Sequence, residues 1–211
     1  MELRGVFLPL PTPFTDDGST ISEIRFSRVI RHFSQKPEIE GFVVSAQAGE
    51  FSVCSIQERK ILTEFAVRDA KGMPVLVNVT SVGSSAMLDL AQHAARHGAR
   101  MAICAPPIYG DITDEEISAF WSLMANYAGI PIIVVDPSNR LTPEIKSHIE
   151  RFPQLKLASP LQNGMFSQPT TDEFQFEGLK VSPLAAVHPS LVGKQLTNLS
   201  LVQNLGTNRM M

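Results

Sequence analysis

The feature that most constrains the fold is a regular alternation of short apolar runs with amphipathic stretches of helical period. The apolar runs are continuous, as in Pro131-Ile-Ile-Val-Val135, and strands of this kind are buried on both faces. This pattern is typical of a parallel sheet that is covered by helices. We expect six strands and five helices in strict alternation: strands at 6–13, 41–46, 74–79, 101–105, 131–135 and 155–159, and helices at 21–33, 55–70, 85–97, 113–127 and 142–152.

The helix ends carry their own signals. Ser55 with Glu58, and Thr113 with Glu116, have the spacing of capping boxes, in which two side chains satisfy the free N–H groups at a helix start. Gly98 is placed to end the third helix in a left-handed conformation. These signals fix three helix boundaries independently of the hydrophobic pattern.

Two architectures accommodate such a chain, a closed barrel or a doubly wound open sheet. No Gly-x-Gly-x-x-Gly follows the first strand, which weakens the dinucleotide-binding alternative. After residue 160 the chain becomes rich in polar residues and proline, with a strand expected at 179–182, a short helix at 187–196 and a fraying end at 197–211. We therefore divide the chain into six βα units (1–160) and an atypical, partly irregular remainder (161–211), in which no eighth strand is expected.

Composition narrows the function. The 211 residues are 44% hydrophobic and 18% charged, with a formal net charge of −3 and no basic cluster, so neither nucleic acid nor an anionic membrane is an expected partner. No apolar run approaches the ~20 residues of a membrane span, and the start lacks a signal-peptide pattern. Two cysteines favour a reducing cytoplasm. His93 and His97 have zinc-compatible spacing, but no carboxylate–histidine pattern accompanies them, so no metal is expected.

Five segments together resemble the dihydrodipicolinate synthase / N-acetylneuraminate lyase family in order and spacing. They are Gly5-Val-Phe with Thr12-Pro-Phe-Thr-Asp-Asp-Gly18, Gly41-Phe-Val-Val with Gly49-Glu50 and Glu58-Arg59, Pro74-Val-Leu-Val-Asn-Val79, Pro106-Pro-Ile-Tyr109, and Pro131-Ile-Ile-Val-Val-Asp-Pro-Ser-Asn-Arg140. The resemblance implies a parallel (β/α)8 TIM barrel, a homo-oligomer, and a site at the C-terminal ends of the strands. It also implies class I aldolase chemistry on a pyruvate-type keto acid through a Schiff base, without a cofactor.

The family's functional positions are only partly kept here. Gly49 and Glu50 match the substrate loop, Tyr109 matches a catalytic tyrosine, and Arg140 matches an arginine that guides the second substrate. The threonine pair that holds the keto-acid carboxylate falls on Gln47 and Ala48, which we retain as substrate-binding candidates. The proton-shuttling tyrosine falls on Val135, and the Schiff-base lysine falls on Ser159, also a candidate for substrate binding.

The nearest lysine to that position is Lys156, and two registers are open. If Ser159 faces the barrel interior, then Lys156 faces outward, because side chains alternate along a strand. Counting back from Gly164 places the lysine position on Pro160 instead. In that register Lys156 faces inward, roughly 13 Å below the mouth at ~3.3 Å per residue. We expect the outward or edge position.

Length is the last constraint. A (β/α)8 barrel typically needs ~250 residues, and strand six ends near residue 160, so we expect an incomplete barrel of about six or seven units. Three functions stay open: a carbon–carbon lyase or aldolase, a non-catalytic family member that binds a small acid or serves as an oligomer subunit, and a different enzyme on the same barrel.

Overall fold

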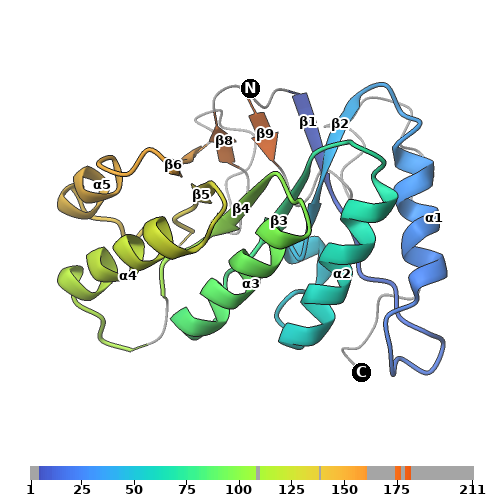
Figure 1. Ribbon diagram of the computed structural model, residues 1–211, viewed down its shortest axis with the longest axis horizontal. Coiled ribbons are helices and arrows are strands. Elements are labelled where there is room, and N and C mark those ends of the chain that lie inside the picture. Colours follow the sequence, from blue (N-terminus) through green and yellow to red (C-terminus); the bar gives the residue numbers. More distant parts are fainter. Residues whose placement is uncertain (1–4, 108–109, 138, 161–173, 177–178, 182–211) are drawn as a thin grey trace.

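The computed structural model describes residues 5–107, 110–137, 139–160, 174–176 and 179–181. Its first six strands alternate with five helices, as the sequence predicts (Figure 1). The strands are β1 (Gly5–Pro9), β2 (Ile39–Val44), β3 (Val75–Asn78), β4 (Met101–Cys104), β5 (Ile132–Val134) and β6 (Leu155–Leu157). The helices are α1 (Glu23–Phe33), α2 (Ile56–Asp69), α3 (Ser84–Arg96), α4 (Asp114–Tyr127) and α5 (Pro143–Ile149), with a short 3-10 helix, η1 (Gln47–Gly49).

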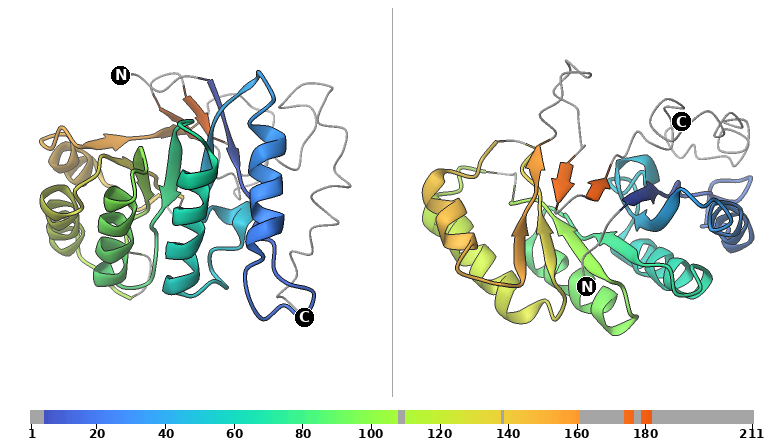
Figure 2. Two further views of the ribbon diagram at one scale, coloured as in Figure 1. Left: turned by 45° about the vertical axis from the view of Figure 1, so that its right-hand side comes forward. Right: turned by 90° about the horizontal axis from the view of Figure 1, so that it is seen from above.

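The six strands lie side by side in chain order, and every neighbouring pair is parallel. The sheet curves, and the five helices line its outer face (Figure 2). This arrangement is an incomplete α/β barrel, which confirms the predicted fold class. None of the described helices is long and apolar enough to cross a membrane.

Three further strands extend the sheet beyond β1: β7 (Ser159–Pro160), β8 (Phe174–Phe176) and β9 (Leu179–Val181). β9 pairs in parallel with β1, whereas β8 pairs antiparallel with both β9 and β7. The predicted strand at 179–182 is therefore confirmed as β9. The expectation that no eighth strand exists was wrong, because Phe174-Gln-Phe176 is too short a run to stand out from its polar surroundings.

The sheet carries an apolar cluster on each face. The outer cluster lies between the sheet and the helices and includes Trp121 and Met124 of α4. The inner cluster lies on the concave face. Its buried members are Phe7, Val43, Leu76, Met101, Ile103 and Ile133, with Ala46, Val135 and Ala158 packed against them. Burial on both faces is the reason that the strands read as continuous apolar runs.

Local signals in the sequence explain several boundaries. Both predicted capping boxes form, at Ser55–Glu58 and at Thr113–Glu116, and Gly98 has a φ of +86° just after α3. Gly41 permits a close approach between strands, since a Cβ there would lie 2.4 Å from the Pro74 carbonyl oxygen and 2.5 Å from the Phe7 ring. Most strands are one to three residues shorter than predicted, and α5 ends at Ile149 rather than 152. The helix expected at 187–196 and the fraying end at 197–211 lie outside the described residues.

Candidate functional site

The loop after β2 places the first group of predicted site residues at the C-terminal edge of the sheet. Gln47, Ala48 and Gly49 form η1, with Gln47 exposed and Gly49 buried. The Thr12 hydroxyl donates to the Gly49 carbonyl at 2.6 Å, which ties this loop to the end of β1. Glu50 ends the turn in the left-handed region at φ 53°, and its N–H donates to the Gln47 carbonyl. No periodicity indicates this turn, because three residues are too few to show a period.

Backbone strain marks the start of the same loop. Ser45 directly follows β2 with a φ of 56°, a conformation that few residues other than glycine adopt. Its side chain is buried, and its Oγ has no hydrogen-bond partner among the described residues. Strained residues of this kind concentrate at functional sites, so Ser45 is a site candidate that the sequence analysis missed.

Asn78 and Thr80 connect the ends of three strands by side-chain hydrogen bonds. The Asn78 amide donates to the Ser45 carbonyl at 2.7 Å, and its Oδ1 accepts from the Thr80 N–H at 3.1 Å. The Thr80 hydroxyl in turn accepts from the Ala105 N–H at 3.0 Å. The ends of β2, β3 and β4 are thus held in a fixed relation. The only sequence signal for this network is the polar Asn78 at the end of an apolar run.

Arg59 supplies a buried positive charge beneath these strand ends. Its guanidinium donates to the carbonyls of Asn78 (2.6 Å) and Thr80 (2.8 Å), and the Phe51 ring lies 5.3 Å away. Within the described part of the chain no carboxylate pairs with it. Burial lowers the pKa of Arg59 from 12.5 to about 10, so the group stays charged at neutral pH. This charge makes the region around the strand ends favourable for an anion.

The remaining predicted site residues are more scattered. Arg140 is half-buried in the loop after β5, where its backbone N–H donates to Asp136 Oδ1 at 2.8 Å. Three strand-to-strand steps separate β5 from β2 in the sheet. Val135 lies against the inner cluster. Ser159 belongs to β7, where it pairs with Gln175, and Tyr109 lies outside the described residues.

Lys156 faces the inner side of the sheet. It pairs with Ile133 of β5, a member of the inner cluster, and paired residues of parallel strands present their side chains to the same face. Ala158, two residues further along, also packs against the inner cluster, as alternation requires. The expectation that Lys156 faces outward was therefore wrong. Sequence could not decide the point, because only the pairing with β5 fixes the register.

Lys156 also lies closer to the C-terminal ends of the strands than the inward register predicted. It is one residue from the end of β6. Successive strand pairs place it level with Asn78 of β3: Asn78 pairs with Ile103, Ile103 with Ile133, and Ile133 with Lys156. The next inner layer contains Val135 and Ala158. At ~3.3 Å per residue, Lys156 thus starts roughly 6–7 Å below that layer. Its flexible four-carbon stem can point toward the strand ends.

Away from the strand ends, a second group of polar side chains joins two helices. Glu64 of α2 lies next to His93 and His97 of α3. No pattern along the sequence indicates this carboxylate, because Glu64 comes from the neighbouring helix.

The fold and the strand-end loops define a parallel α/β barrel protein with its candidate site at the C-terminal edge of the sheet. Residues 2–155 match the Dihydrodipicolinate synthetase family, and the chain belongs to that family. A relative from Thermococcus onnurineus, described as an uncharacterized DapA-like lyase, is 33% identical over 134 residues, covering 63% of this chain and 44% of the relative. The 4-hydroxy-tetrahydrodipicolinate synthase of Methanothrix thermoacetophila is 31% identical over 146 residues, covering 69% and 48%.

Solved structures agree on the fold. A prophage protein of E. coli K12 from the dihydrodipicolinic acid synthase family, solved in complex with pyruvate, superposes with a TM-score of 0.66 at 23% identity, covering 74% of this chain and 55% of the other. The chain thus spans about half the length of the relatives that it matches.

Proposed function

We propose that this chain is a carbon–carbon lyase or aldolase that acts on a pyruvate-type keto acid, with Lys156 as the amine that forms the Schiff base. The observation that carries the proposal is the inner-face position of Lys156, one layer below Val135 and Ala158. Family membership supports the class of reaction. The residues that we propose to contact the substrate are Gln47, Ala48, Gly49, Glu50, Arg140, Ser159 and Tyr109.

The chemistry follows from an amine at that position. The neutral Nζ attacks the keto carbon and a carbon–nitrogen bond forms; the keto oxygen takes one proton from the nitrogen and one from solvent, and leaves as water. The resulting iminium accepts electrons from the adjacent carbon, so a carbon–carbon bond to that carbon can be made or broken.

The charge pattern supports an acidic substrate. Arg59 is a buried cation with carbonyl partners only, in the described part of the chain, and it lies under the ends of β2 and β3. The Ser45 hydroxyl is a donor that is still available there. A keto acid carries one carboxylate, which such a surface attracts. The complex of the E. coli K12 family protein with pyruvate shows that a related barrel takes this ligand.

A second function is favoured by one specific observation. Val135 occupies the position of the proton-shuttling tyrosine and packs against the inner cluster, so it cannot transfer a proton. A chain that binds the keto acid without turning it over is consistent with that change. Under the lyase proposal, the same change predicts slow turnover, because catalytic groups that act as a unit lose most of their effect when one is missing.

The deciding experiment is borohydride trapping. The purified chain is incubated with pyruvate and sodium borohydride, and its intact mass is measured, followed by peptide mapping. Hydride reduces the iminium to a secondary amine, so the expected adduct is pyruvic acid less one oxygen, on Lys156 alone. Lys156→Arg keeps a positive charge but should give no adduct. Lys146→Met removes an exposed lysine of α5 and should leave the adduct unchanged.

A wild-type protein that is folded by circular dichroism and gives no adduct would contradict the lyase proposal. Calorimetric binding of pyruvate by that same protein would then support the non-catalytic function. An adduct that still forms in Lys156→Arg would show that another amine forms the Schiff base.

We also infer a cytoplasmic homo-oligomer. The chain has only two cysteines, Cys54 and Cys104, and so low a number suits a reducing compartment. Burial raises the pKa of the Cys104 thiol, so this cysteine acts as a small apolar side chain rather than a nucleophile.

A further inference from the structure

Glu64, His93 and His97 bring three metal-ligating atoms together on the outer side of the barrel, where α2 and α3 lie next to each other (Figure 1). His93 Nε2 is 3.1 Å and His97 Nε2 is 3.8 Å from Glu64 Oε1. The two imidazole rings are 4.0 Å apart between centroids, and all three ligand atoms lie within 4.8 Å of one another. This cluster is separate from the strand-end site, and the proposed lyase function makes no use of it.

The hydrogen bonds around the rings leave both Nε2 atoms oriented toward the carboxylate. His97 Nδ1 lies 2.9 Å from the His93 carbonyl oxygen, which can only accept, so Nδ1 carries the proton and Nε2 keeps its lone pair. His93 is only 8% exposed, and its Nε2 is buried with no hydrogen-bond partner among the described residues, since the 3.1 Å contact to Glu64 is not aligned as a hydrogen bond. A buried polar atom without a partner is costly unless something binds it.

We propose that Glu64, His93 and His97 form a binding site for a divalent transition-metal ion, with zinc as the expected ion, that joins α2 to α3. Two imidazole nitrogens at i and i+4 on one helix and a carboxylate oxygen from its neighbour match the ligand set of open zinc sites. Three protein ligands leave the fourth tetrahedral position to water. Calcium and magnesium are disfavoured, because they prefer oxygen ligands alone.

The geometry needs only a small adjustment. Bonds of about 2.0–2.1 Å in a tetrahedron place ligand atoms about 3.3 Å apart. The Glu64–His93 pair already meets this spacing, and the Glu64–His97 pair is slightly wide. The side chains of Glu64 and His97 are 43% and 39% exposed, so both can turn toward an ion.

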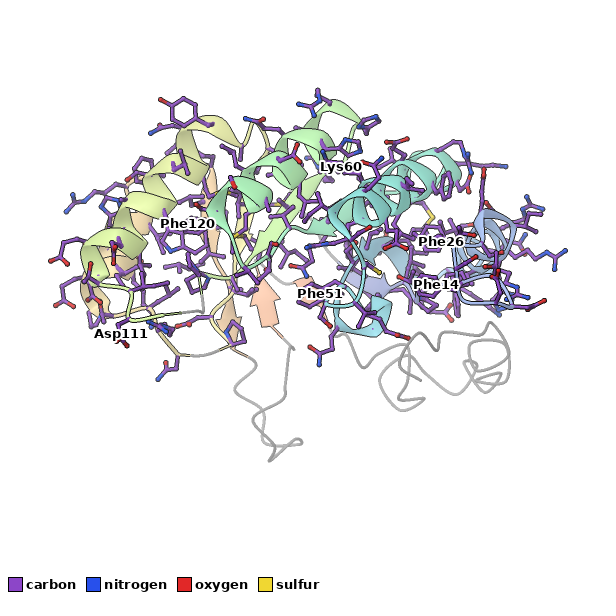
Figure 3. All side chains as sticks on the ribbon, turned by 90° about the horizontal axis from the view of Figure 1, so that it is seen from below. Phe14, Phe26, Phe51, Lys60, Asp111 and Phe120 are labelled. Carbon is purple, nitrogen blue, oxygen red and sulfur yellow. The ribbon has the colours of Figure 1, made fainter. Side chains whose placement is uncertain are left out.

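Charges around the cluster allow a cation to bind. Lys60, labelled in Figure 3 on the same pair of helices, is the opposing charge nearby, and a 2.7 Å ion pair with Asp89 partly neutralises it. The Glu64 carboxylate contributes the negative charge at the site itself.

The test is zinc titration of the full chain after treatment with a chelator. We expect one ion per chain by calorimetry and a rise in the midpoint of thermal unfolding, because a ligand that binds only the folded state stabilises it. Loss of a group that only orients a metal ligand weakens metal binding by about 10–100-fold. His97 is proposed as a ligand itself, so His97→Gln should weaken zinc binding by at least about tenfold. His32→Gln on α1 is the matched control and should leave the affinity unchanged. Cobalt(II) bound at the same site should show visible bands without thiolate charge transfer.

Three results would overturn the proposal: no zinc binding by the folded chain, equal affinity in His97→Gln and His32→Gln, or a thiolate band that assigns the ion to a cysteine. Glu64→Gln guards against loss of folding in the histidine variant. This change keeps the side chain's shape and should weaken binding while the thermal midpoint without zinc stays within a few degrees.

Discussion

Arg59 shows how one residue can hold several strand ends in place. Its guanidinium is 3% exposed and donates to two main-chain carbonyls that end β3, while the Asn78 side chain carries the connection on to β2. Charge-assisted bonds to carbonyls replace the water that burial removes, so the cation is tolerated without a carboxylate. The same residue therefore supports the site's geometry and its positive potential.

Replacing Arg59 tests that role. Arg59→Met keeps most of the buried volume but leaves the carbonyls of Asn78 and Thr80 without donors, which should lower the free energy of unfolding by on the order of 3 kcal/mol. Urea unfolding followed by circular dichroism measures it. Arg28→Met, an exposed change on α1, should alter stability by less than about 0.5 kcal/mol. Equal effects of the two changes would show that the network does not matter for stability.

Residues differ in how far sequence alone could place them. The capping pair Ser55–Glu58 is local, so spacing was sufficient to predict it. Gln47 and Gly49 were placed correctly in the strand-end loop by resemblance. Glu64 and Lys156 were not, because the first depends on how two helices pack and the second on how two strands pair. Ser45 was missed since no pattern of residue types reports a backbone angle.

At the scale of helices and strands, polar side chains join α1 to α2. The Ser27 hydroxyl of α1 donates to Asp69 Oδ2 at 2.5 Å, and Arg68 donates to Asp69 Oδ1 at 2.8 Å and to Glu23 of α1 at 2.8 Å. These bonds lower the pKa of Asp69, with the bond from Arg68 contributing most and partial burial acting in the opposite direction. The end of α2 is thereby attached to the start of α1.

This attachment should depend on pH in one direction. Because the folded state lowers the pKa of Asp69 below 3.8, the unfolded chain binds more protons in that range, and stability rises with pH there. The contribution is complete above pH 3.8 and is lost as the pH falls through the folded-state pKa. Asp69→Asn should therefore flatten the dependence of the unfolding free energy on pH below 3.8.

Denaturant titrations at a series of pH values measure that slope. Asp111→Asn, at an exposed position before α4, is the control and should retain the slope of the parent. A slope in Asp69→Asn equal to that of the parent would contradict the assignment.

The order and type of the helices and strands in residues 1–160 could be predicted from the hydrophobic period and the capping residues. The exact ends of the strands could not. All six strands stop before their predicted C-terminal ends, because pairing, not apolar character, sets where a strand stops. Phe174–Phe176 was not predicted because three residues are too short a run to show a period among polar neighbours.

The whole molecule is a barrel without its full set of βα units. Chains of this family are about twice the length of the matched region, and an incomplete barrel leaves strand edges and apolar surface to be covered. Ile24, Val82 and Tyr127 are large apolar side chains that are more than 60% exposed.

We therefore expect the purified chain to associate. Light scattering coupled to size exclusion should give a mass that is a multiple of the 23.1 kDa chain mass, and dilution should not reduce it to a single chain at micromolar concentration. A monodisperse single chain that is folded would contradict this expectation, and would mean that the described strands cover the barrel's exposed edge by themselves.

The pairing of β9 with β1 has a consequence for the order in which the chain folds. Among themselves, β1 to β6 pair in chain order, each with the strands next to it in sequence, so these six can assemble one after another as they leave the ribosome. The β1–β9 contact instead joins the first described strand to the last, and closing so long a loop is slow. We expect two kinetic phases on refolding, a fast one for the six-strand body and a slow one for β9. The nascent protein would then form its six-strand body before β9 is made.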